Sequence, residues 1–182
     1  MDIHRLAARA ALSACCLAPW AGAVGADSHR SPYATPVYED RAVKSMSNED
    51  RASYLDGAGH GLSLAAELNG YPGPRHVLDL AGPLALTEAQ RAQIHGIIAP
   101  MRQAARQYGK QFVEAEQSLD HLFAAGRADE QSVRKLLHES YTALAQVRGA
   151  HLQAHILARQ ALTPAQVMRY QQLRGYVTGH PH

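Results

Sequence analysis

One short motif occurs twice in the chain, and each copy has the features of a helix start. Leu-Thr-Glu-Ala-Gln ends at Gln90, and Leu-Thr-Pro-Ala-Gln ends at Gln166. The hydroxyls of Thr87 and Thr163 can accept hydrogen bonds from backbone N–H groups in the first helical turn. The glutamine three residues further on can reach back to complete a capping box. The motif therefore predicts two helices, one beginning after Thr87 and the other after Thr163.

Between the two motifs, apolar residues recur three and four positions apart, which is the spacing of long helices packed along their length. This pattern predicts a helix over residues 88–125 and another over residues 130–161. The short link at residues 126–128 contains glycine and forces the two helices into an antiparallel hairpin. A last helix is predicted over residues 164–176. The predicted fold is thus all-α, a four-helix hairpin-type bundle with two long antiparallel helices.

At one position of the second long helix, two neighbouring residues fit the apolar stripe equally well. Tyr141 and its neighbour Ser140 both fit the spacing between Leu137 and Leu144. Further along, the same stripe includes His151, so that one histidine is predicted to lie on the packed face.

The N-terminus has the pattern of a secretory signal peptide over residues 1–26. Two arginines precede an apolar run, and small residues follow that suit cleavage after Ala23 or Ala26. The alternatives are a lipoprotein signal that ends at Cys15 and an uncleaved signal anchor. Because Cys15 and Cys16 are the only cysteines, the cleaved chain has no thiol for a disulfide or a thiolate metal site. We therefore expect an exported, periplasmic protein.

The remaining chain divides by composition into three parts. The leader up to about residue 44 is mixed and polar, and we interpret it as flexible. Short helices are predicted over residues 48–55 and 62–68, and after the break at Asn-Gly-Tyr-Pro-Gly-Pro a brief one over residues 76–80. The predicted parts are a flexible, partly helical N-terminal segment at 27–74, a helical domain at 75–177 and a C-terminal tail at 178–182.

Composition and motifs exclude several classes of function. The net charge of +2 is too small for nucleic acid to be the main partner. The sequence has no nucleophile motif, no phosphate-binding loop and no pair of carboxylates with an acid–base role. We therefore expect no enzymatic activity.

Eleven histidines are the clear compositional excess, and two of them have ligand spacing. His151 and His155 are four residues apart on the second long helix, so both imidazoles project from one face. Two such nitrogens can bind one zinc, nickel, cobalt or copper ion. His76 and His60 are candidate further ligands if the N-terminal segment folds over the hairpin. The alternative is that these histidines border the core or lie at the surface without a metal.

Arg102, Arg106 and Lys110 recur every four residues and form a basic stripe on the first long helix. Such a stripe can attract acidic or partly unfolded protein clients. The alternative is an ordinary solvated helix face.

The paired Leu-Thr-x-x-Gln motif, spaced across a helical hairpin in an exported chain, resembles the Spy/CpxP family. The segment Ala-Ala-Glu-Leu-Asn-Gly-Tyr-Pro-Gly-Pro-Arg-His, which ends at His76, resembles the lead-in of its heavy-metal resistance subgroup, with ZraP- and CnrX-like relatives. The resemblance implies a bowed helical hairpin, usually a homodimer. In metal-sensing relatives a histidine and a second ligand four residues later precede the second motif, and His151 and His155 match these positions. Histidine rather than methionine at 155 favours borderline ions over Cu(I).

The resemblance implies a metal-responsive protein of envelope stress or heavy-metal resistance. In that interpretation a divalent transition metal at His151 and His155 alters helix packing and contact with a membrane-bound stress or metal signalling protein. The alternative is an ATP-independent periplasmic chaperone that holds unfolded envelope proteins on its basic stripe.

Overall fold

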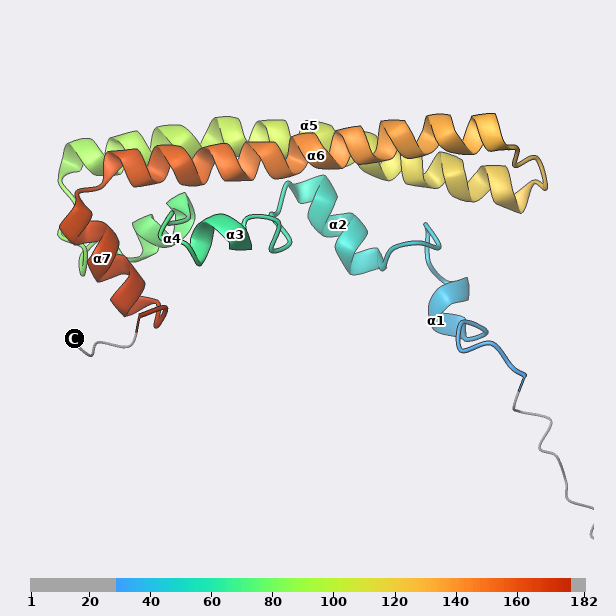
Figure 1. Cartoon of the computed structure of the whole chain (residues 1–182), viewed down its shortest axis with the longest axis horizontal. Helices are drawn as coiled ribbons and strands as arrows, with labels where there is room; N and C mark the ends of the chain where they lie inside the picture. The colour runs from blue at the N-terminus through green and yellow to red at the C-terminus, as the bar shows by residue number, and fades with distance from the viewer. Residues whose placement is uncertain (1–28, 178–182) are drawn as a thin grey trace, which may run out of the picture. The chain divides into compact units, whose positions relative to one another are not determined.

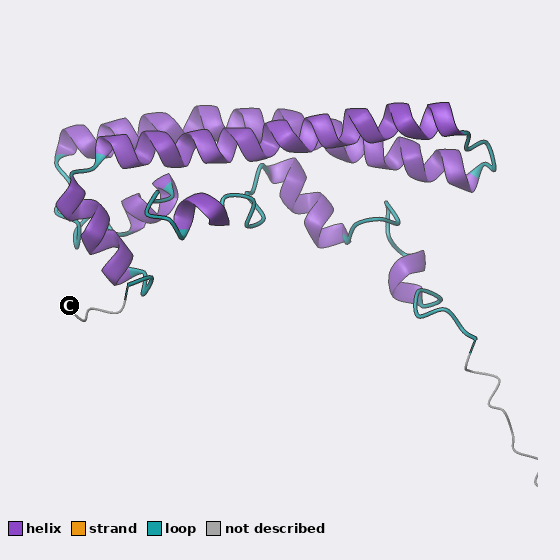
Figure 2. Cartoon of the chain, viewed as in Figure 1, coloured by secondary structure: helices purple, strands orange, loops and turns teal. Residues whose placement is uncertain are grey.

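The computed structural model describes residues 29–177, and it places only helices and their connections there (Figures 1 and 2). Contacts divide the chain into one unit up to Thr35 and another from Pro36 onward. In the first unit the described residues form turns around Tyr33. The helices all belong to the second unit: α1 Pro36–Glu39, α2 Asn48–Asp56, α3 Leu64–Glu67, α4 Pro74–Asp79, α5 Glu88–Ala124, α6 Glu130–Ala161 and α7 Pro164–Leu173. No helix among these is long and apolar enough to cross a membrane.

The long helices α5 and α6 pack side by side, as the apolar spacing predicts, and run in opposite directions, as the short link predicts (Figure 1). Gly126 makes the turn between them with a φ of 64°, a left-handed conformation that glycine adopts without strain. The Asp129 side chain then caps α6 by accepting a hydrogen bond from the Ser132 N–H at 2.9 Å. Ser140 fills the open stripe position and is 1% exposed, whereas Tyr141 is 64% exposed.

Both copies of the repeated motif form the predicted capping boxes, and the two boxes also bond to each other. The amide nitrogen of Gln90 donates to the amide oxygen of Gln166 at 2.8 Å, and the reverse bond measures 3.1 Å. Gln90 also donates to the Ala161 carbonyl, and Gln166 donates to the Leu84 carbonyl. The starts of α5 and α7 are therefore joined by a reciprocal pair of amides.

Two apolar clusters form the core of this unit. One joins α4, α5, α6 and α7 around Ile94 and Tyr170, both fully buried. The other joins the region before α2 to α5 and α6 through Val43 and Phe112. Val43 lies at the end of the segment interpreted as a flexible leader, so that part of the leader contributes to the core.

Helix α2 lies on α5 at very short range. A Cβ atom at Gly109 of α5 would lie 2.2 Å from the Tyr54 carbonyl oxygen of α2, so only glycine permits this approach. Ser47 caps the start of α2 and Gly57, with a φ of 74°, ends it, as the sequence indicates.

Three predicted helices differ from the structure by more than one residue at an end. α3 is shorter than residues 62–68, α4 begins two residues before His76, and α7 ends at Leu173 instead of Tyr176. At the start of α4, Pro74 takes the first helical turn, where its missing N–H costs nothing. Tyr176 instead follows α7, and its hydroxyl donates to the carboxylate of Glu67 at 3.1 Å.

Candidate functional site

Helix α6 places His151 and His155 on a face that the N-terminal segment covers. The two side chains are 7% and 6% exposed. Gly59 covers the first, because a Cβ at this position would lie 3.2 Å from the His151 ring. Gly73 covers the second in the same way, at 3.2 Å from the His155 ring. Because Gly59 and Gly73 have no side chain, their loops can pack directly on the rings of His151 and His155.

His151 has a buried ring nitrogen without a protein partner. Its Nε2 is inaccessible to solvent and makes no hydrogen bond within the described structure. Burial lowers the pKa of His151 below its usual value, and the nearby His155 and His60 lower it further, against a hydrogen bond to the Gly57 backbone that raises it. The ring is therefore neutral at neutral pH and keeps a nitrogen lone pair, which a metal ligand needs.

His155 is held by the loop before α4. Its Nδ1 lies 2.7 Å from the Tyr71 carbonyl oxygen and 3.6 Å from a carboxylate oxygen of Glu67. A carbonyl only accepts, so Nδ1 carries the proton and Nε2 carries the lone pair in the neutral ring. This is the outer-shell contact that orients metal-binding histidines in proteins.

Glu67 is the centre of a polar cluster that the sequence did not indicate. Its carboxylate is 5% exposed and accepts hydrogen bonds from the Gly73 N–H at 2.9 Å and from the Tyr170 hydroxyl. His76 Nδ1 and Arg174 Nε each lie 3.6 Å away. Desolvation, followed by the bond to Glu67, raises the pKa of Tyr170, which therefore stays protonated and donates. Charged residues are almost never fully buried unless they are paired. Nothing in the sequence around Glu67 indicates that its carboxylate would be buried and paired.

A cavity of about 450 Å³ lies between the N-terminal loops and the hairpin. His151 and His76 line this cavity, whereas His155 and His60 do not. The wall of the cavity also includes the side chains of Met101, Ile98, Arg102 and Arg75. Two of the four predicted histidines thus share one cavity wall.

His60 lies against α2 instead. Its ring stacks on Tyr54 with centroids 4.4 Å apart, and its Nδ1 lies 3.6 Å from Asp50. It lines a different cavity, of about 500 Å³, together with Glu116. Its φ of 45° is unusual for a residue other than glycine.

In residues 29–177, no three His, Cys, Asp or Glu side chains are grouped closely enough to hold a metal ion by themselves. The predicted histidines therefore do not form a complete set of such ligands. His180 and His182, the signal peptide and both cysteines lie outside the described residues.

The predicted basic stripe is occupied by ion pairs. Arg102 and Arg106 both bind the carboxylate of Asp56 at the end of α2, at 3.0 and 2.6 Å. Lys110 lies 3.7 Å from Glu114 on its own helix. The two arginines therefore attach α2 to α5, a structural role beside the client binding that the basic stripe predicts.

Comparison with known proteins identifies no relative. No protein-family model matches the sequence, no curated protein matches it, and no solved structure matches.

Proposed function

We propose that this chain is an exported, non-enzymatic protein that binds a transition-metal ion at His151 and responds to it. The observation that carries the proposal is the buried, unpartnered Nε2 of His151 beside a cavity. A buried polar atom without a partner costs roughly 1–3 kcal/mol, and a bound metal would remove that cost. The lowered pKa of His151 supports this role, since protons compete less for its lone pair.

The neighbouring groups support the same proposal. His155 is one helical turn away, and its ring is oriented by Tyr71 and Glu67 as outer-shell groups orient metal ligands. His76, beside Glu67, lines the cavity with His151. A metal held here would connect α6 to the loops around α3 and α4, and so stabilise the N-terminal segment on the hairpin.

The proposal includes the biological setting that the resemblance to the Spy/CpxP family implies. In it, residues 1–26 direct export to the periplasm, the hairpin with its shorter helices is a four-helix Spy/CpxP-type bundle, and the protein forms a homodimer. Its role is in heavy-metal resistance or envelope stress, through contact with a membrane-bound signalling protein.

The chaperone alternative has less support. Asp56 already neutralises part of the charge of Arg102 and Arg106, which the alternative needs for clients.

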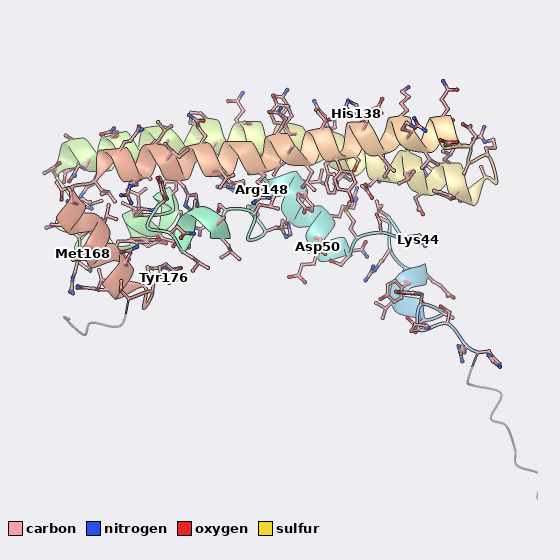
Figure 3. The ribbon with its side chains drawn as sticks, viewed as in Figure 1. Lys44, Asp50, His138, Arg148, Met168 and Tyr176 are labelled. Carbon is pink, nitrogen blue, oxygen red and sulfur yellow. The ribbon has the colours of Figure 1, made fainter. Side chains whose placement is uncertain are left out.

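Isothermal titration of the full chain with Zn(II), Ni(II), Co(II) and Cu(II) tests the metal proposal. All proteins should carry Cys15→Ser and Cys16→Ser, so that thiolates cannot bind the metal. We expect saturable binding of at least one ion, abolished by His151→Gln and weakened by His155→Gln. The matched control is His138→Gln, an exposed histidine on α6 that points away from α2 (Figure 3). Equal binding by the parent and His151→Gln would refute the proposal.

A further inference from the structure

We propose that the cavity beside His60 binds a small organic cation that carries a quaternary ammonium group. This cavity, of about 500 Å³, is lined by the segment before α2, by α2 and by both long helices. Its volume is in the range of small-molecule sites in proteins. No residue lines both this cavity and the one beside His151, so each proposal can be refuted without the other.

Three aromatic rings line the cavity: Tyr54 of α2, Phe112 of α5 and Tyr141 of α6. The Tyr54 and Phe112 rings meet edge-on, with centroids 4.8 Å apart. Tyr141 is 64% exposed, so its ring is open to a ligand. The faces of aromatic rings carry negative partial charge, and proteins use such rings to recognise quaternary ammonium groups.

Two carboxylates give the same cavity a negative charge. Asp50 lies one helical turn before Tyr54, and Glu116 lies one turn after Phe112, so each carboxylate is a neighbour of a ring on its own helix. The Ser47 hydroxyl donates to Asp50 at 2.7 Å and is the main cause that lowers the pKa of this carboxyl. Asp50 is therefore ionised at neutral pH.

One guanidinium, that of Arg41, also lines the cavity. It lies 4.2 Å from the centroid of the Tyr38 ring and donates to the Lys44 carbonyl at 3.4 Å. With His60 neutral, two carboxylates against one guanidinium leave one net negative charge on the lining. A monovalent cation neutralises this charge.

Measured contacts place the α2 side of the cavity in one cluster. The His60 ring stacks on Tyr54 with centroids 4.4 Å apart, and its Nδ1 lies 3.6 Å from Asp50. Because Tyr54 also meets Phe112, a carboxylate and the aromatic rings are linked here without a gap.

Glu116 connects the other side of the cavity in the same way. Its carboxylate accepts hydrogen bonds from the hydroxyls of Ser45 at 2.7 Å and Ser140 at 2.5 Å. Ser140 directly precedes Tyr141, so the exposed ring begins next to a residue that holds Glu116. The second carboxylate is thus fixed beside both long helices.

The hydrogen bonding of the carboxylates decides the class of cation. Glu116 accepts from two serines and Asp50 accepts from a third, so part of their accepting capacity is used. A primary ammonium has three donors to satisfy, whereas a quaternary ammonium has no N–H and needs only negative charge and apolar contact. Met46 and Leu144 supply apolar contact for its methyl groups. A metal ion fits less well, because residues 29–177 contain no suitable group of three His, Cys, Asp or Glu side chains.

NMR titration of the full chain with choline tests the proposal. The comparison ligand is the neutral carbon isostere of choline, in which a tert-butyl group replaces the trimethylammonium group. We expect saturable shifts of amides in α2 and around Glu116 with choline and none with the isostere, and weaker choline binding at higher salt. Equal shifts with both ligands, or no saturable shift with choline, would overturn the cation site.

Two variants with matched controls locate the cation. Glu116→Gln removes the charge but can keep both serine bonds, and it should weaken choline binding by at least about threefold, the scale of losing one nearby charge. Glu114→Gln, at an exposed carboxylate of the same helix outside the cavity, should leave binding unchanged. Tyr141→Leu should weaken binding by about two- to fivefold, the scale of one exposed cation–ring contact, and Phe123→Leu, at a similarly exposed ring, should not. Equal affinity in the parent, Glu116→Gln and Tyr141→Leu would also overturn the site.

Quaternary ammonium groups occur in soluble compounds and in lipid headgroups, and cosedimentation with vesicles distinguishes these sources. Sedimentation with phosphatidylcholine but not with phosphatidylglycerol vesicles, reduced by Glu116→Gln, would identify a lipid headgroup as the ligand. Binding of choline without such sedimentation would identify a soluble cation. Neither result bears on metal binding at His151, which is measured by its own titration.

Discussion

At the scale of single residues, Gln90 and Gln166 each serve two purposes. Each amide oxygen closes the capping box of its own helix by accepting from the backbone N–H of Thr87 or Thr163. Each amide nitrogen then donates to the other glutamine and to a carbonyl next to the other motif. All of these bonds depend on the primary amide, which has both a donor and an acceptor.

Replacing Gln90 therefore removes more than a helix cap. We expect Gln90→Ala to lower the free energy of unfolding by about 2 kcal/mol, the sum of a cap and a partly buried hydrogen bond. Gln107→Ala, at an exposed position of the same helix, should change it by less than about 0.5 kcal/mol. Urea unfolding measures both.

A double-mutant cycle separates the amide pair from the two caps. Gln90→Ala combined with Gln166→Ala should cost less than the sum of the single changes, because the second change has no shared bond left to break. Strict additivity would mean that the two boxes act independently.

At the scale of helices, the contact between α2 and α5 depends on one missing methyl group. Gly109 places the backbone of α5 against the Tyr54 carbonyl, and Arg102 and Arg106 bind the end of α2 a little further along. The Tyr54 ring packs edge-on against Phe112 at 4.8 Å, one turn after Gly109. Helix α2 is short and has no buried residue of its own, so these contacts hold it in place.

We expect Gly109→Ala to lower the free energy of unfolding by about 1–3 kcal/mol, the cost of forcing an extra group into a packed interface. Matched controls are Gly96→Ala in α5 and Gly149→Ala in α6, where an added Cβ meets no atom within 4 Å. Each control should stabilise the protein by up to about 1 kcal/mol, because alanine is the better helix former. Urea unfolding of all three variants measures the difference, and a stabilising Gly109→Ala would contradict the close approach.

Hydrogen exchange locates the effect of Gly109→Ala. Amides of α2 should lose protection in that variant while those in the middle of α6 keep theirs, because the damage is confined to the contact of α2 with α5.

At the scale of the whole second unit, the N-terminal loops and α4 cover the buried face of α6. That cover desolvates His151 and so lowers its pKa. In the unfolded chain the ring has its ordinary pKa and binds a proton that the folded protein does not bind. The contribution of His151 to stability is therefore fully present above its ordinary pKa of about 6.5 and is lost as the pH falls toward the lowered folded value.

The temperature of half-unfolding of the metal-free protein should therefore decrease when the pH is lowered from 7.5 to 5. His151→Gln should reduce this fall, since glutamine does not titrate, and His138→Gln should leave it unchanged. His155 and His60 lie near His151, and His76 lines the same cavity; all three histidines are kept unchanged in both variants. An equal pH dependence in the parent and His151→Gln would contradict desolvation of this ring.

Local signals predicted most of the helical framework. The start of α5 after Thr87 and both ends of α6 fall where the caps and spacing place them, because capping and periodicity act within a few residues. The shorter helices α3 and α4 were predicted less well, since their ends depend on contacts with α6 and α5 and not on their own spacing.

The candidate site was predicted only in part, for the same reason. The four-residue spacing of His151 and His155 placed both on one face of the helix, and the structure buries that face. It did not indicate that His76 shares a cavity with His151 while His60 lies elsewhere, or that Met101 lines that cavity. Those relations join residues far apart in the chain, and no local pattern contains them.

The sequence by itself determined where the long helices begin, where the chain reverses and which faces are apolar, because neighbouring residues fix each of these features. Only the tertiary structure decided that Glu67 is buried among two tyrosines and two histidines, that Gln90 bonds to Gln166, and that Gly109 admits α2. These features require separate segments to meet, and burial changes the chemistry of the groups that meet there. The unpartnered nitrogen of His151 is one result of that burial.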